Sequence, residues 1–175
     1  LGTKLKEAGY DVDIFIEDLG GIDLKRVIEA DVVGISTITS TAPRAYQIAK
    51  ELRDIGKTVL MGGSHPTFLP EESLKFSDIV IRGEADDVIV DLISALEKGE
   101  GFEGIKGISI INDGVYYAHP DPGRCIDMDN IPIPDFSLIR GLKEAMKVVP
   151  VMTSRGCPFN CKFCSVTEVF GRLYR

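Results

Sequence analysis

The sequence has 175 residues, and its 20 Lys and Arg against 27 Asp and Glu give a formal net charge of −7 at pH 7. Hydrophobic residues make up 44% of the chain, which is enough to build a core and excludes wholesale disorder. The acidic balance argues against binding to nucleic acid or to an anionic membrane through bulk electrostatics. No apolar run approaches the roughly 18 residues of a membrane helix, and the start lacks a signal-peptide profile. We therefore expect a cytoplasmic α/β protein and, because position 1 is Leu, an excerpt of a longer chain.

The first 98 residues alternate between helical periodicity and short apolar runs. We expect helices over residues 1–8, 22–29, 42–52, 71–75 and 89–98. We expect strands over residues 12–16, 31–36, 58–61 and 78–81. This alternation predicts parallel βαβ units in a Rossmann-like, flavodoxin-like sheet that binds ligands at the carboxyl ends of its strands. The nearly continuous apolar run at 31–36 is typical of a strand buried on both faces. Since the chain opens in a helix, we hypothesise that the sheet lacks its first strand, next to the strand over 12–16.

The rest of the chain has a different pattern. Residues 108–117 predict a β-hairpin, because the pair Asp113-Gly114 favours a tight turn. A Pro-rich linker over 119–135, a helix over 137–147 and a strand over 148–153 are expected to follow. We therefore divide the chain into an α/β domain (1–98), a hairpin and linker (99–147) and the start of a further domain (148–175).

The cysteines carry most of the functional information. Cys157, Cys161 and Cys164 have the spacing C-x3-C-x2-C, whereas Cys125 is remote. Crowded thiols indicate metal ligands in a reducing compartment rather than a disulfide framework. Three thiolates on one loop can each bind one iron of a [4Fe–4S] cluster and leave the fourth iron open for a substrate or cofactor. Structural zinc is an alternative that needs Cys125 or His119 as a fourth ligand, and ferredoxin-type carriers have a different spacing. Without such a role, Cys125 is interpreted as a half-buried linker thiol.

The cysteine segment closely resembles the cluster loop of the radical S-adenosylmethionine (SAM) enzymes. The resemblance implies that Cys157, Cys161 and Cys164 bind a [4Fe–4S] cluster whose open iron chelates SAM, and that Phe163 lies against the adenine. It also implies reductive cleavage of SAM to a 5′-deoxyadenosyl radical, with an external electron donor of the flavodoxin or ferredoxin type. In this family the loop follows the first strand of a partial TIM-like barrel, so residues 148–175 are expected to be the truncated start of that barrel.

Three loops are expected at strand ends of the α/β domain, over residues 36–41, 62–67 and 83–86. Taken singly, their hydroxyls and glycines are as consistent with helix caps and chain turns as with ligand binding. Together, and upstream of the cysteine loop, they resemble the cobalamin-binding domain of one large radical SAM subclass. The resemblance covers roughly residues 1–98 and is carried by Leu5–Val12, Val33–Ser36, Gly62–Thr67 and Arg82–Glu84.

This second resemblance implies a pocket for the corrin and its nucleotide tail, lined by Ser36, Thr37, Gly62 and Gly63. The D-x-H-x-x-G signature, whose His ligates cobalt in many cobalamin proteins, is not found in this sequence. His65 is in a different segment from that signature. We therefore assign His65 to packing, or to a hydrogen bond near the rim of the pocket.

Other charged residues are given structural roles. The pairs Glu71-Glu72 and Asp86-Asp87 are interpreted as charges that favour helix N-termini, not as a catalytic dyad. Arg172 and Arg175 form a basic tail that is too sparse to indicate nucleic acid.

Taken together, the sequence predicts a fragment of a cobalamin-dependent radical SAM enzyme that performs methyl transfer or rearrangement at an unactivated carbon of a small-molecule substrate. Two alternatives stay open: a non-catalytic corrinoid-binding module, and a radical SAM enzyme whose sheet domain no longer binds cobalamin. The methylthiotransferase branch is disfavoured, because it has extra cysteines in its N-terminal domain and residues 1–98 have none. We expect the 175-residue chain alone to be inactive, because it ends before a barrel closes.

Overall fold

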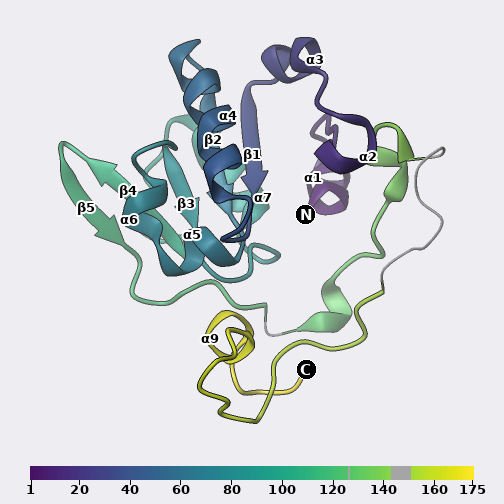
Figure 1. Cartoon of the computed structure of the whole chain (residues 1–175), viewed down its shortest axis with the longest axis vertical. Coiled ribbons are helices and arrows are strands. Elements are labelled where there is room, and N and C mark those ends of the chain that lie inside the picture. Colours follow the sequence, from purple (N-terminus) through teal and green to yellow (C-terminus); the bar gives the residue numbers. More distant parts are fainter. Residues whose placement is uncertain (126, 143–150) are drawn as a thin grey trace.

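The computed structural model describes residues 1–125, 127–142 and 151–175. Its centre is a five-stranded sheet whose strands follow one another in chain order (Figure 1). The strands are β1 (Val32–Ser36), β2 (Thr58–Gly62), β3 (Ile79–Ile81), β4 (Ile108–Asn112) and β5 (Val115–Ala118). β1, β2 and β3 are parallel, whereas β4 is antiparallel to both β3 and β5. The predicted α/β fold is confirmed, with a sheet that is mixed and not wholly parallel.

Helices cover both faces of this sheet, α4 on one face and α7 on the other (Figure 1). The helices are α1 (Gly2–Glu7), α2 (Glu17–Gly20), α3 (Leu24–Glu29), α4 (Ala42–Asp54), α5 (Ser64–Phe68), α6 (Pro70–Ser73), α7 (Ile89–Lys98) and α9 (Val166–Phe170). Two short 3-10 helices, η1 (Met128–Asn130) and η2 (Phe136–Leu138), lie in the Pro-containing segment. The sequence pattern does not indicate α2, α5 or α9, because each is only four or five residues long and has no periodic apolar face.

Alternate residues of β2 build the two halves of the core, because successive side chains of a strand point to opposite faces. Val59 and Met61 pack in one buried cluster with residues of α4, whereas Leu60 packs in the other with Leu92 of α7. Val59, Met61 and Leu92 are all fully buried. β2 is therefore covered on both faces, as strands joined by helical crossovers are.

Local signals set several element ends. The Asp23 carboxylate accepts hydrogen bonds from the backbone N–H groups of the first turn of α3, which caps that helix. α7 ends at Gly99, whose φ of +66° is the left-handed conformation that terminates helices. In the predicted hairpin, Asp113 and Gly114 have φ values of +49° and +76°, as a two-residue turn between β4 and β5 requires.

Two expectations about the start of the sheet are wrong. Residues 12–16 do not form a strand of the sheet: Ile14 donates to Leu138 O at 2.9 Å and accepts from Arg140 N at 2.9 Å, an isolated bridge to Ile139. These backbone groups therefore find their partners in the later segment. Among the described strands β1 is an edge strand, half-buried to exposed, and not buried on both faces as its apolar run predicts.

The C-terminal half differs from expectation in three further respects. The hairpin is confirmed, but it continues the sheet, because β4 pairs with β3 along Ile79–Ile81. Of the helix expected over 137–147, residues 143–147 lie outside the described residues, and the expectation is wrong for residues 139–141, which follow η2 as a bridge and a turn. Of the strand expected over 148–153, residues 148–150 lie outside the described residues, and 151–153 are exposed and form no strand.

Candidate functional site

The loops after β1 and β2 meet at the carboxyl edge of the sheet. Ser36 is paired with Gly62, and Thr37 N donates to Gly62 O at 3.0 Å. Gly63 has a φ of +99°, and a Cβ placed on it would lie 2.9 Å from Thr37 N and 3.2 Å from Ser36 Oγ. Any side chain at Gly63 would therefore collide with the neighbouring loop. The structure brings together all four residues of the predicted pocket.

The four residues differ in what they offer to a ligand. Ser36 is exposed, and Gly62 and Gly63 are partly exposed. Thr37 is buried, and its hydroxyl lies 2.8 Å from Thr41 Oγ1 and donates to Ile38 O at 3.1 Å. The Thr37 side chain therefore holds the loop before α4 in shape, while the Ser36 hydroxyl and the glycine backbone remain accessible.

His65 is buried on the first turn of α5, and both of its ring nitrogens have partners. Nε2 lies 2.7 Å from the Tyr46 hydroxyl, and Nδ1 lies 3.3 Å from Thr39 Oγ1. The Tyr46 hydroxyl is also 3.1 Å from Ser73 Oγ. His65 thus joins α4, α5 and the loop after β1 through hydrogen bonds. A hydrogen-bonding role is what the sequence predicts for His65, whereas its place at the rim of a cobalamin pocket stays a prediction.

The segment with the three cysteines is closed at its base. Arg155 and Arg175 exchange two backbone hydrogen bonds of 2.9 Å, and Cys157 N donates to Gly171 O at 3.2 Å. Gly156 has a φ of +86° and lies against the carbonyl of Leu173, where a side chain would not fit. We call residues 155–175 the cysteine loop. Its two ends lie side by side.

The cysteine loop holds three free thiols. Cys157 and Cys164 are half-buried, Cys161 is exposed, and the Phe163 side chain is 92% exposed. Among the described residues, no three His, Cys, Asp or Glu side chains are grouped closely enough to hold a metal ion. The donor set itself fits an iron–sulfur cluster, since the thiols are unpaired and share one loop, and such ligands commonly gather as the metal binds.

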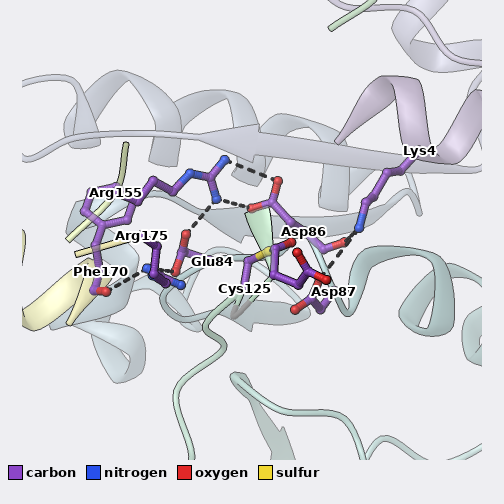
Figure 2. Close-up of polar contacts among 9 residues, drawn as sticks. Lys4, Glu84, Asp86, Asp87, Cys125, Arg155, Phe170 and Arg175 are labelled. Carbon is purple, nitrogen blue, oxygen red and sulfur yellow. Dashed lines mark hydrogen bonds and ion pairs between the residues drawn. The ribbon is translucent and has the colours of Figure 1, made fainter. Parts of the chain in front are cut away.

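Buried ion pairs attach the base of the cysteine loop to the loop after β3 (Figure 2). Arg155 Nη1 donates to Glu84 Oε1 and to Asp86 Oδ2, both at 2.6 Å. Arg175 Nη2 donates to Glu84 Oε2 at 2.7 Å and to Phe170 O at 2.7 Å. The Glu84 side chain is only 2% exposed. The cysteine loop therefore lies at the same carboxyl edge as Ser36 and the glycines (Figure 1).

Sequence reasoning misses this group of charges. Arg155 and Glu84 are 71 residues apart, so no local spacing connects them. Arg175 is not a solvated tail residue, because its side chain is buried against Glu84. Asp86 binds Arg155, and Asp87 lies 3.6 Å from Lys4, so both carboxylates have cationic partners beyond a helix dipole.

The loss of folding stability at acidic pH should depend on Asp86. Burial raises the pKa of Asp86, but the hydrogen bonds and charge of Arg155 outweigh it and hold the pKa below its usual value. A carboxyl with a lowered native pKa stabilises the fold above its unfolded pKa of about 3.9, and that stabilisation is lost as the pH falls through the native pKa. We expect Asp86→Asn to cost about 1.5–3 kcal/mol at pH 7 and to reduce the loss below pH ~4. Urea unfolding between pH 7 and 3 measures both, and parallel curves for the two proteins would contradict this prediction.

Cys125 should be far less reactive than the loop thiols. It is fully buried, and burial together with the nearby Asp87 raises its pKa to about 11. At pH 8 this lowers the thiolate fraction roughly two-hundredfold relative to an ordinary cysteine. We expect iodoacetamide to label Cys161 rapidly and Cys125 only after denaturation, as peptide mass spectrometry would show. Equal labelling of the two thiols in the folded chain would contradict this.

These features together define an α/β domain that carries a three-cysteine loop at the carboxyl edge of its sheet. The chain belongs to the B12-binding domain family: the family model described as "B12 binding domain" matches residues 1–93. The predicted resemblance of residues 1–98 to a cobalamin-binding domain is thereby confirmed. None of the helices in the described residues has the length and hydropathy needed to cross a membrane.

Several known proteins are similar to this chain. An uncharacterized methyltransferase of Pyrococcus horikoshii is 39% identical over 175 residues, which cover 94% of this chain and 38% of that protein. An anaerobic magnesium-protoporphyrin IX monomethyl ester cyclase of Rubrivivax gelatinosus is 33% identical over 202 residues, covering 100% of this chain and 35% of that protein. The chain thus spans less than two fifths of the length of either relative.

One solved structure has the same fold over nearly the whole chain. The radical SAM methyltransferase TsrM of Kitasatospora setae, with cobalamin and a [4Fe–4S] cluster bound, superposes with a TM-score of 0.72 at 15% identity. The match covers 99% of this chain and 39% of TsrM. The similarity is one of fold, and it includes both the sheet and the segment that follows it.

Proposed function

We propose that this chain is the cobalamin-binding and cluster-loop part of a radical SAM enzyme that drives methyl transfer or rearrangement at an unactivated carbon. The observation that carries the proposal is the attachment of a loop with three free cysteines to the ligand edge of a B12-family sheet. In such sheets ligands bind where the carboxyl ends of the strands meet. Two redox-active groups held at one edge would lie within reach of a shared substrate.

Two sets of residues would bind the two cofactors. Ser36, Thr37, Gly62 and Gly63 would line the cobalamin pocket, where the closeness of the two loops leaves backbone and one hydroxyl facing the ligand. Cys157, Cys161 and Cys164 would supply thiolates to three irons of a [4Fe–4S] cluster, and the exposed Phe163 ring would be covered by the adenine of SAM. When bound, the cluster supplies the electron that cleaves SAM, and cobalamin supplies a carrier for a methyl group.

Other parts of the proposal concern the whole protein. They comprise a small-molecule substrate, an external electron donor of the flavodoxin or ferredoxin type, and a cytoplasmic location. The proposed boundaries are an α/β domain over 1–98, a hairpin and linker over 99–147, and the start of the radical SAM domain over 148–175. We expect no 5′-deoxyadenosine from the 175-residue chain by itself.

The test is to supply the chain with iron and sulfide in one experiment and with a cobalamin in another. Anaerobic reconstitution with iron and sulfide should give roughly four irons per chain and broad absorbance at the edge of the visible range. Titration with hydroxocobalamin should change its spectrum, and the corrinoid should co-elute with the chain. A colourless protein that holds one zinc per chain would overturn the cluster assignment, and a corrinoid that elutes separately would overturn the cobalamin assignment.

A corrinoid-binding module without radical chemistry is the second candidate. The observation that favours it is the extent of the family match, which covers residues 1–93 and does not reach the cysteine loop. Binding of hydroxocobalamin without any uptake of iron would establish this second candidate.

A further inference from the structure

Glu84 receives one arginine from each arm of the cysteine loop. Its Oε1 accepts from Arg155, where the loop begins, and its Oε2 accepts from Arg175, where the loop returns (Figure 2). The two arms also bond to each other through their backbones at 2.9 Å. The Glu84 carboxylate therefore bridges the two arms of the cysteine loop and joins them to the segment that follows β3.

The position of Glu84 is itself fixed by the α/β domain. Glu84 N donates to Gly123 O at 2.7 Å, and Gly123 N donates to Arg82 O at 3.1 Å. On the other side, Gly83 N donates to Thr67 Oγ1 at 2.9 Å. The segment that carries the Glu84 carboxylate follows β3 and is therefore fixed by hydrogen bonds to Gly123 on one side and to Thr67 on the other.

The buried charges at this contact balance. Glu84 and Asp86 face Arg155 and Arg175, all of them largely or wholly buried. Of the apolar side chains of the loop, Val169 of α9 is buried and Leu173 is 68% exposed. Removing one member of a buried ion pair leaves its partner uncompensated, which costs far more than the intact pair contributes. The attachment of the loop should therefore depend on the charge of Glu84.

We infer that Glu84 is a positioning residue that holds the cysteine loop on the α/β domain, so that the order of the three thiols depends on a carboxylate about 70 residues away. The inference rests on the proposed function only where it treats the thiols as cluster ligands. The attachment itself is a property of the chain without metal.

The first test is hydrogen exchange in the metal-free chain. In Glu84→Gln, which keeps the size of the side chain and removes its charge, the amides of Arg155 and Cys157 should exchange on the order of a hundredfold faster. Amides of β2 and β3 should exchange as in the wild type. Glu71→Gln is the matched control, because Glu71 is an exposed carboxylate on α6. In this variant the amides of Arg155 and Cys157 should exchange at the wild-type rate.

A second variant decides the outcome if Glu84→Gln unfolds the whole domain. Arg155→Gln removes the same ion pair from the loop side, and it should accelerate exchange of Cys157 while β2 and β3 stay protected. Loop exchange at the wild-type rate in Arg155→Gln and in any folded Glu84→Gln, or equal acceleration in Glu71→Gln, would overturn the inference.

The last readout separates this inference from the proposed function. After anaerobic reconstitution, Glu84→Gln should lose its iron to a chelator at least tenfold faster than the wild type. If the wild type takes up no iron, the proposed function fails while the exchange result still decides the role of Glu84. If the wild type takes up iron and the variant retains it equally well, the positioning role fails.

Discussion

Replacing Gly83 by alanine should destabilise the α/β domain by about 3 kcal/mol or more, a large part of the stability of an ordinary domain. Gly83 has a φ of +74°, and a Cβ built on it would overlap the carbonyl oxygen of Gly123. The two segments would have to separate, which breaks the hydrogen bonds between Glu84 N and Gly123 O and between Gly123 N and Arg82 O. Urea unfolding followed by circular dichroism measures the loss.

Gly99 provides the matched control for this substitution. Its φ of +66° is nearly the same, but nothing lies within 4 Å of the position of a Cβ. Gly99→Ala should therefore cost only the backbone strain of the left-handed conformation, about 1 kcal/mol. Equal losses in the two variants would show that the contact with Gly123 does not matter for stability.

Replacing any one of Cys157, Cys161 and Cys164 by alanine should lower the iron content after anaerobic reconstitution at least tenfold. Each variant leaves two thiolates for a cluster that is expected to have only three protein ligands, so a second iron loses its ligand. Iron and sulfide assays, together with the visible spectrum, measure the effect. The fold should be preserved, because the three side chains are exposed or half-buried and lie outside both buried core clusters.

Cys125→Ala is the control for the cysteine series. Cys125 is fully buried, its Sγ donates to Asp127 O at 3.4 Å, and alanine is tolerated in such a place at a modest cost. This variant should keep the iron content of the wild type. Loss of iron in Cys125→Ala, with iron retained in Cys161→Ala, would point to a different ligand set.

Much of the secondary structure around the sheet follows from the sequence alone, because its signals are local. The apolar run of β2, the amphipathic α7 with Gly99 at its end, and the Asp113-Gly114 turn each specify one element and its limits. Pairing between elements is not encoded in this way. The apolar pattern of residues 12–16 gives no information about a partner, and in the structure Ile14 bonds to the segment around Ile139.

The candidate site shows the same division. The spacing of the three cysteines is visible within one segment, so sequence reasoning finds them. The ion pairs of Glu84 depend on how segments far apart in the chain fold together, and neither a charge count nor a motif distinguishes a buried glutamate from an exposed one. Arg175 illustrates the difficulty. Its place at the end of the sequence suggests a solvent-exposed side chain, but in the structure this side chain is buried.

The hairpin formed by β4 and β5 has a consequence for the route of the chain. β4 runs away from the carboxyl end of β3 and β5 runs back toward it, so an even number of added strands returns the polypeptide to the side it left. The bridge between Gly83 and Gly123 marks this return. Extending the two strands by equal numbers of residues at the Asn112–Val115 turn would leave the exit point unchanged. A single additional strand would deliver the linker, and everything after it, to the opposite side of the protein.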